Sequence, residues 1–169
     1  MRGRLDHPAP ARRASGPDRG CATGAEFEPR EHISWLIKQA FHYTRRAADE
    51  AMRAHGVTSA QGGVLIRLAQ RPGLSAADLA RLMFITPQAA QQTLTALEGL
   101  GLVERSADPN NARILRAVLT TRGLEVATGC RADALEVEQR LLGVLDADER
   151  KAFTDFLLRY MCDSPPADE

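Results

Sequence analysis

A segment near the middle of the chain carries uncharged hydrogen-bonding side chains at the spacing of one helix face. Thr86-Pro87 is a typical helix start, because threonine caps free backbone N–H groups and proline fits the first turn. Glutamine pairs with adenine in the major groove of DNA, and threonine reaches a thymine methyl group or a phosphate. Such side chains suit base recognition, although an ordinary solvated helix face has the same composition. The polar set, opposite an apolar face, is Gln88, Gln91, Gln92 and Thr95.

Two helices joined by a tight connection must position these side chains. Ser75-x-x-Asp78 is a capping box that starts a short helix, and residues 83–85 connect this helix to the one that begins at Thr86. This is the spacing of a helix-turn-helix, in which the second helix enters the major groove.

The rest of the pattern is helical on both sides of a β-hairpin. Apolar residues at steps of three and four predict a long helix over 31–54 and a second helix that starts at Thr58. Two short strands follow, at 102–105 and 114–119, with a turn-rich loop over 106–112 between them. Helical periodicity returns after Thr120, where three glycines weaken it, and Asp146 starts a last helix. The predicted order is a long helix, three shorter helices, a hairpin and two helices.

A set of short motifs runs from the first helix of the helix-turn-helix to the end of the hairpin: Leu79-Ala80, Thr86-Pro87, Leu97-Glu98-x-x-Gly101-Leu102-Val103-Glu104-Arg105, Asp108-Pro109-x-Asn111-x-Arg113 and Leu119-Thr120-x-x-Gly123. With these motifs the sequence resembles the MarR family of winged-helix transcriptional regulators over about residues 31–162. The resemblance implies a mainly α fold with a small β-hairpin wing, a winged helix-turn-helix. It implies a lobe over 58–120 that binds double-stranded DNA and dimerisation helices over 30–57 and 121–162. We expect flexible ends at 1–29, where the composition cannot bury enough apolar surface to fold alone, and at 163–169.

The resemblance also implies roles for residues of the wing. Arg113 is similar to the arginine that reads the minor groove in this family, and a solvated charge at a strand end is the alternative. Arg81, Arg105 and Arg116 are candidates for phosphate contacts, which position a protein without reading sequence. The expected DNA-binding set is Thr86, Gln88, Gln91, Gln92, Thr95, Arg105, Asn111, Arg113 and Arg116.

Asn111 departs from the pattern of the family, which usually has aspartate two residues before the wing arginine. A carboxylate at this position helps to orient the arginine through a charge-assisted hydrogen bond. The amide keeps an acceptor oxygen and loses the charge. We therefore expect a looser wing and weaker minor-groove recognition than is usual for the family.

The family resemblance implies a regulator, most often a repressor, that binds an inverted-repeat operator as a homodimer and is released by a small aromatic or anionic ligand. Trp35, His42, Tyr43 and Arg46 offer apolar walls and a cation for such a ligand, although packing in the core or the dimer is the alternative. A redox-sensing regulator of the same fold is a second hypothesis, which requires a thiol of lowered pKa. The candidate thiols are Cys21, Cys130 and Cys162.

Other classes of function find less support in the sequence. Because it has no nucleophile elbow, no phosphate-binding glycine loop and no cluster of metal ligands, we predict no enzyme, no metal site and no cofactor. A winged-helix module that contacts only proteins is a further alternative. Without an apolar run of about 18 residues or the apolar core of a signal peptide, we expect a cytoplasmic protein, associated with a prokaryotic nucleoid and not with a membrane.

The charges of the chain cancel in total and differ along its length. The 169 residues include 22 Lys and Arg and 22 Asp and Glu. Residues 1–30 contain 6 basic and 4 acidic residues, residues 31–120 contain 10 and 7, and residues 121–169 contain 6 and 11. The positive surplus therefore lies with the predicted DNA-binding part. Residues 75–120 hold four of each sign, so we expect modest non-specific affinity for DNA.

Overall fold

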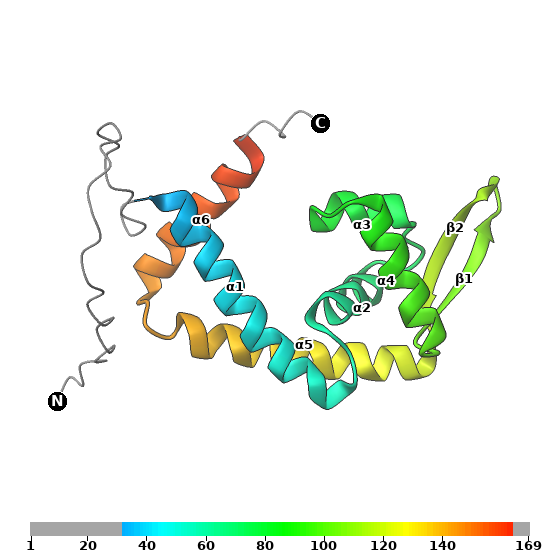
Figure 1. Ribbon diagram of the computed structural model, residues 1–169, viewed down its shortest axis with the longest axis horizontal. Helices are drawn as coiled ribbons and strands as arrows, with labels where there is room; N and C mark the ends of the chain where they lie inside the picture. The colour runs from blue at the N-terminus through cyan, green and yellow to red at the C-terminus, as the bar shows by residue number, and fades with distance from the viewer. Residues whose placement is uncertain (1–31, 164–169) are drawn as a thin grey trace, which may run out of the picture.

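Helices α1 and α6 lie at one end of the molecule and a helix-turn-helix with its hairpin lies at the other (Figure 1). The computed structural model describes residues 32–163. Helix α5 runs between the two ends and packs against both α1 and α2. The predicted element order and the mainly α winged fold are confirmed. The elements are α1 (Ile33–Met52), η2 (Arg53–His55), α2 (Ser59–Gln70), α3 (Ala76–Met83), α4 (Pro87–Gly99), β1 (Val103–Asp108), β2 (Asn111–Leu119), α5 (Thr121–Leu142) and α6 (Ala147–Asp163).

Side-chain caps start most of these helices at the predicted residues. Thr58 and Ser75 each form a complete capping box, with Gln61 and Asp78 as the reciprocal acceptors. Thr86 caps α4 through a hydrogen bond from the Ala89 N–H to its hydroxyl (3.1 Å). These bonds join residues three positions apart, so the sequence alone was sufficient to find them.

Helix α5 is continuous where its glycines predicted a weak helix. A Cβ atom at Gly123 would lie 1.9 Å from the carbonyl oxygen of Leu102, and one at Gly129 would lie 2.4 Å from the ring of His55. Both glycines therefore allow other parts of the chain to approach α5 closely. They are sites of tight packing and do not interrupt the helix.

The hairpin is longer than the sequence predicted, and its strands take up most of the expected loop over 106–112. Ala107 pairs with Leu115, but the next pair along the ladder is Asp108 with Asn111. Residues 112–114 of β2 therefore have no partner on β1, and Arg113 is at the centre of this bulge. Leu74, before α3, forms an isolated antiparallel bridge with Ala117 of β2.

The hydrophobic core lies inside the lobe formed by α2, α3, α4 and the base of the hairpin. Its fully buried large side chains include Leu65, Leu68, Leu79, Leu94 and Leu97. The core continues onto α5 through Ala127 and Cys130. Truncating a buried leucine of this kind costs about 2–5 kcal/mol, so the lobe supplies most of the fold's apolar stabilisation.

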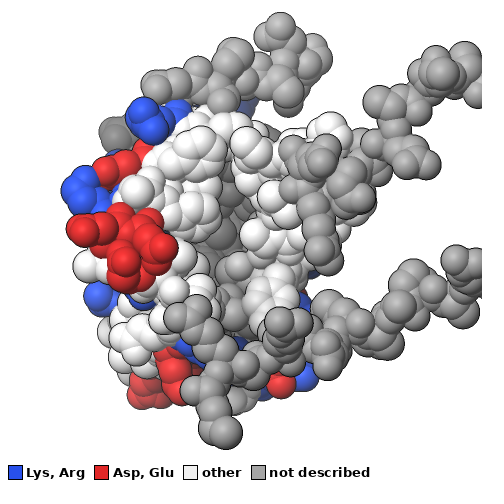
Figure 2. Space-filling view, turned by 90° about the vertical axis from the view of Figure 1, so that its left-hand side faces the viewer, with Lys and Arg blue, Asp and Glu red and all other residues white. Residues whose placement is uncertain are grey.

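Helix α6 and the first turns of α1 contribute little to this core. No residue of α6 with a described side chain is buried, and the helix packs only marginally on the other elements. Most of its large apolar side chains are exposed, as are Ile33 (65%) and Phe41 (58%) on α1. Seen from the end of the molecule at which α1 and α6 lie, uncharged residues occupy the middle of the view around a hollow, with charged residues along its left edge (Figure 2). An amphipathic helix ordinarily buries its apolar face, but the other elements of residues 32–163 leave the apolar faces of α6 and of the first turns of α1 exposed.

Among residues 32–163, no helix is both long enough and apolar enough to cross a membrane.

Phe84 adopts a backbone conformation that suits glycine. It ends α3 with φ 53° and ψ 44°, and it is the one non-glycine residue of positive φ between residues 32 and 163. Its side chain is 77% exposed, so the ring adds little to the core. A left-handed conformation costs a residue with a Cβ atom about 1–2 kcal/mol.

Phe84→Gly is therefore expected to stabilise the protein, because it removes this strain and sacrifices little buried area. The melting temperature should rise by about 2–4 °C in a thermal unfolding experiment. Phe84→Ala is the matched control, since it removes the ring but keeps the Cβ atom, and its melting temperature should not rise. A fall in melting temperature for the glycine variant would show that the phenylalanine ring itself stabilises the turn.

Candidate nucleic-acid interface

Burial of one face of α4 presents the opposite face to solvent. Ala90, Leu94 and Leu97 point into the core and are at most 1% exposed. The connection from α3 is tight, with the Ile85 N–H donating to the Ala80 carbonyl (3.1 Å). The side chains of the predicted base-contacting set are all exposed: Thr86, Gln88, Gln91, Gln92 and Thr95.

Arg105 lies beneath α4 and is held by side chains of that helix. Its Nε donates to Glu98 Oε2 (2.9 Å), Nη2 forms an ion pair with the same carboxylate, and Nη2 also reaches the Thr95 hydroxyl (3.4 Å). The side chain is only 10% exposed, and its Nη1 is buried without a hydrogen-bond partner. The guanidinium ties β1 to the second half of α4, and it would have to leave Glu98 to reach a phosphate.

Arg116 joins three separate parts of the lobe. Its Nε donates to Asp108 Oδ2 on β1 (2.6 Å). Its Nη1 donates to Asp78 Oδ2 on α3 and to the Gly73 carbonyl before that helix, each at 3.2 Å. Like Arg105, Arg116 is paired with carboxylates of the protein itself. The sequence could not reveal its contacts with Gly73 and Asp78, because these residues are distant along the chain.

Arg113 differs from these two arginines in being unpaired. Its side chain is exposed, and no ion pair within residues 32–163 involves its guanidinium. Its backbone N–H donates to Asn111 Oδ1 (3.1 Å). Asn111 thus orients the backbone of Arg113, whereas the sequence led us to expect a contact with the guanidinium.

Hydrogen bonds keep two aspartates of the lobe ionised, Asp78 at the start of α3 and Asp108 at the end of β1. The Ser75 hydroxyl and N–H both donate to Asp78 Oδ2, and with smaller contributions from Arg81 and Arg116 they lower the pKa of Asp78 to about 2. The hydrogen bond from Arg116 lowers the pKa of Asp108 in the same way. Both carboxylates are therefore charged when they meet the Arg116 guanidinium at neutral pH.

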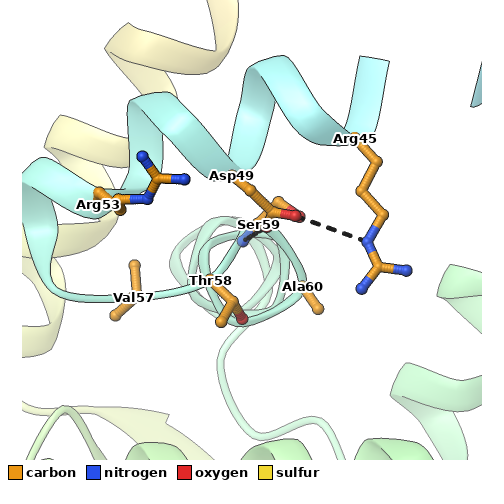
Figure 3. A pocket seen from close by; sticks show the side chains of 7 residues that line it. All are labelled: Arg45, Asp49, Arg53, Val57, Thr58, Ser59 and Ala60. Carbon is orange, nitrogen blue, oxygen red and sulfur yellow. Dashed lines mark hydrogen bonds and ion pairs between the residues drawn. The ribbon is translucent and has the colours of Figure 1, made fainter. Parts of the chain in front are cut away.

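The four expected ligand-binding residues, Trp35, His42, Tyr43 and Arg46, lie on the exposed part of α1, and none of them lines the nearest cavity. That cavity, of about 230 Å³, lies further along α1, against the start of α2 (Figure 3). Its charged side chains are Arg45, Asp49 and Arg53, which follow one another at steps of four.

Asp49 connects the two helices that form this cavity. Its Oδ1 accepts a hydrogen bond from the Ser59 N–H (2.8 Å), and its carboxylate lies 3.7 Å from Arg45 Nε. Hydrogen bonding to Ser59 lowers its pKa. The steps of four on α1 were visible in the sequence, but the position of α2 beside them was not.

The surroundings of Cys130 do not suit a redox sensor. Cys130 is completely buried in the core, and burial together with the nearby Asp133 raises its pKa. A sensing thiol needs the opposite shift. Cys162 is exposed on α6, and Cys21 lies outside the described residues.

Comparisons with known proteins agree on one family. The sequence model of the MarR family matches residues 55–114. The transcriptional repressor Rv2887 of Mycobacterium tuberculosis is 34% identical over 125 residues, which cover 74% of this chain and 90% of the relative. The crystal structure of Rv2887 with salicylic acid has 32% identity and a TM-score of 0.61, over 76% of this chain and 96% of that one.

A second solved structure is a mutant MarR from Escherichia coli complexed with operator DNA. It is 26% identical with a TM-score of 0.69, and the alignment covers 77% of this chain and 93% of that chain.

The carboxylate of Asp78 is expected to make stability depend on pH. Its pKa is depressed on folding, so its contribution is complete above the pKa of the unfolded carboxyl group and disappears as the pH falls from about 4 to about 2. Asp78→Asn should lower the free energy of unfolding by about 2 kcal/mol at pH 7, as measured by urea denaturation.

The difference between the wild type and Asp78→Asn should shrink progressively below pH 4. Asp155→Asn is a suitable control, because Asp155 is exposed and its one ion pair within residues 32–163 is with Lys151 on the same helix. A difference that persisted unchanged at pH 2 would mean that the ionised form of Asp78 is not what stabilises α3.

Proposed function

This chain belongs to the MarR family of transcriptional regulators, and from that premise we propose that it is a repressor that binds an inverted-repeat operator as a homodimer. The observation that carries the proposal is the combination of the exposed polar face of α4 with an unpaired arginine on the neighbouring wing. The complex of an E. coli MarR mutant with operator DNA supports the same use of the fold.

The proposed homodimer would form through α1, α5 and α6, which correspond to residues 30–57 and 121–162. It is supported by α6, whose large apolar side chains are left exposed by the other elements of residues 32–163: Phe153, Phe156, Leu158, Tyr160 and Met161. A dimer of this kind would place two copies of the 58–120 lobe side by side. Recognition helices about 34 Å apart, one turn of DNA, would select an inverted repeat.

Within each lobe, the proposed DNA contacts divide between the two grooves. Gln88, Gln91, Gln92 and Thr95 would meet base edges in the major groove, with Thr86 at the start of α4. Arg113 would enter the minor groove from the wing, with its backbone held by Asn111. Phosphate contacts by Arg105 and Arg116 stay predictions, because both guanidiniums would first have to leave their carboxylates.

A small aromatic anion is the proposed effector that releases the DNA. The Rv2887 complex with salicylic acid supports this class of ligand. The cavity in Figure 3 lies between α1, a proposed dimerisation helix, and α2 of the DNA-binding lobe, and it contains two arginines and one aspartate. A ligand there would alter the angle between the two parts. Trp35, His42, Tyr43 and Arg46 stay an alternative site, which would need the partner subunit to enclose it.

Binding to DNA should weaken as the salt concentration rises and should depend on Arg113. The probe is a duplex that the wild-type protein selects from a random pool, titrated by gel shift at several salt concentrations. Arg113→Ala should weaken binding by about tenfold or more, because it removes a minor-groove contact. Arg131→Ala, an exposed residue of α5, should bind like the wild type. Failure of the wild type to select any duplex would refute the proposed function.

Salicylate should weaken operator binding through the cavity arginines. In the same gel shift, Arg45→Gln is expected to lose the response to salicylate while keeping its affinity for DNA, because a carboxylate ligand would lose its cation. Arg46→Gln is the matched control, one residue further along and outside the cavity, and should still respond. If Arg46→Gln lost the response and Arg45→Gln kept it, the salicylate site would lie at Arg46 and its neighbours instead.

A further inference from the structure

We propose that Arg116 is a positioning residue of the wing, which holds the bulge that carries Arg113 and does not itself contact DNA. This inference rests on the proposed function, because Arg113 acts only if the wing meets DNA. It replaces the phosphate contact that the sequence suggested for Arg116.

The ladder of the hairpin leaves the backbone around Arg113 with little support. Regular pairing stops at Ala107 and Leu115, and resumes only at Asp108 and Asn111 beside the turn. Residues 112–114 lie between these two pairs without a partner on β1. The bond from the Arg113 N–H to Asn111 Oδ1 fixes one side of the bulge.

Arg116 and Asp108 span the other side of this bulge. Arg116 pairs in the ladder with Ser106, but its side chain reaches along the hairpin to the Asp108 carboxylate (2.6 Å from Nε to Oδ2). The other oxygen of Asp108 accepts the Asn110 N–H (2.8 Å) and closes the turn. One carboxylate therefore connects the turn to the strand beyond the bulge, and Arg113 is enclosed between the two anchored points.

The same guanidinium fixes the wing to the helix-turn-helix. Its Nη1 meets Asp78 in the capping box of α3 and the Gly73 carbonyl, each at 3.2 Å. Asp78 is held in turn by Ser75 and by Arg81. Arg116 thus relates the position of the bulge to α3, which packs against the recognition helix α4.

The local charge argues against a phosphate contact. Arg116 lies between two carboxylates, so the group of Arg116, Asp78 and Asp108 carries one net negative charge, and Arg81 brings it only to neutral. A phosphate would have to displace both carboxylates from a guanidinium that they already share. Such buried or half-buried pairs are costly to break, so Arg116 is better suited to hold the wing than to bind DNA.

A double-mutant cycle tests this inference on the full-length protein and the duplex that it selects. Arg116→Met should weaken binding by about tenfold, a coupling typical of residues in one ion-pair network, and should leave the salt dependence unchanged. In an Arg113→Ala background, Arg116→Met should have no further effect, because Arg116 acts through Arg113. Asp108→Asn should weaken binding to a similar degree and should not add to Arg116→Met.

One further variant, Arg81→Met, and the Asp108→Asn variant separate positioning from direct contact and from folding. Arg81→Met removes the other cation beside Asp78 but does not touch the hairpin, so its double mutant with Arg113→Ala should show additive effects. Asp108→Asn keeps the cycle informative if Arg116→Met does not fold, because it breaks the same contact from the opposite strand.

The outcomes distinguish this inference from the proposed function. Arg116 would be a phosphate contact if Arg116→Met reduced the slope of log affinity against log salt concentration by about one, and if its effect added to that of Arg113→Ala. This result would overturn the inference and leave the proposed function intact. A wild-type protein that selects no duplex would overturn the proposed function as well.

Discussion

The burial of one face of α4 is the constraint on which the rest of the candidate interface depends. Ala90, Leu94 and Leu97 are removed from water against α2 and α3, and this fixes the rotation of the helix about its axis. Residues on the opposite face are exposed as a consequence and need no contacts of their own to be placed. The rigid core beneath them supplies the precision that hydrogen bonds to base edges require.

The wing needs a different kind of support, because a two-stranded hairpin has no core of its own. The Leu74 bridge extends the base of the hairpin by one strand position, and polar contacts hold the part beyond it. Arg105 ties β1 to α4, and Arg116 ties β2 to α3. Charge pairs therefore fix the wing to the helix-turn-helix in the part of the hairpin that the hydrophobic core does not reach.

Features that depend on nearby residues could be predicted from the sequence, and features that depend on distant ones could not. The capping boxes at Thr58 and Ser75 and the buried face of α4 follow from spacings of three and four residues. The bulge at 112–114 depends on the register of the hairpin, which no local pattern shows. The pairing of Arg116 with Asp78 depends on the position of α3 beside β2. The continuity of α5 was missed for the same reason, because the need for Gly123 comes from Leu102. The MarR-type residue pattern located Arg113, but no local pattern showed how its backbone is held.

The charge balance of the DNA-facing lobe now has a structural explanation. Residues 75–120 contain four arginines and four acidic residues. Arg81, Arg105 and Arg116 pair with Asp78, Glu98 and Asp108, so their charges are largely neutralised within the protein. Only the guanidinium of Arg113 is left unpaired in this segment. A lobe of this kind presents a weak general attraction to phosphates, so discrimination between sequences would rest on the glutamines of α4 and on a single wing arginine, and the exact placement of that arginine matters more than the number of positive charges.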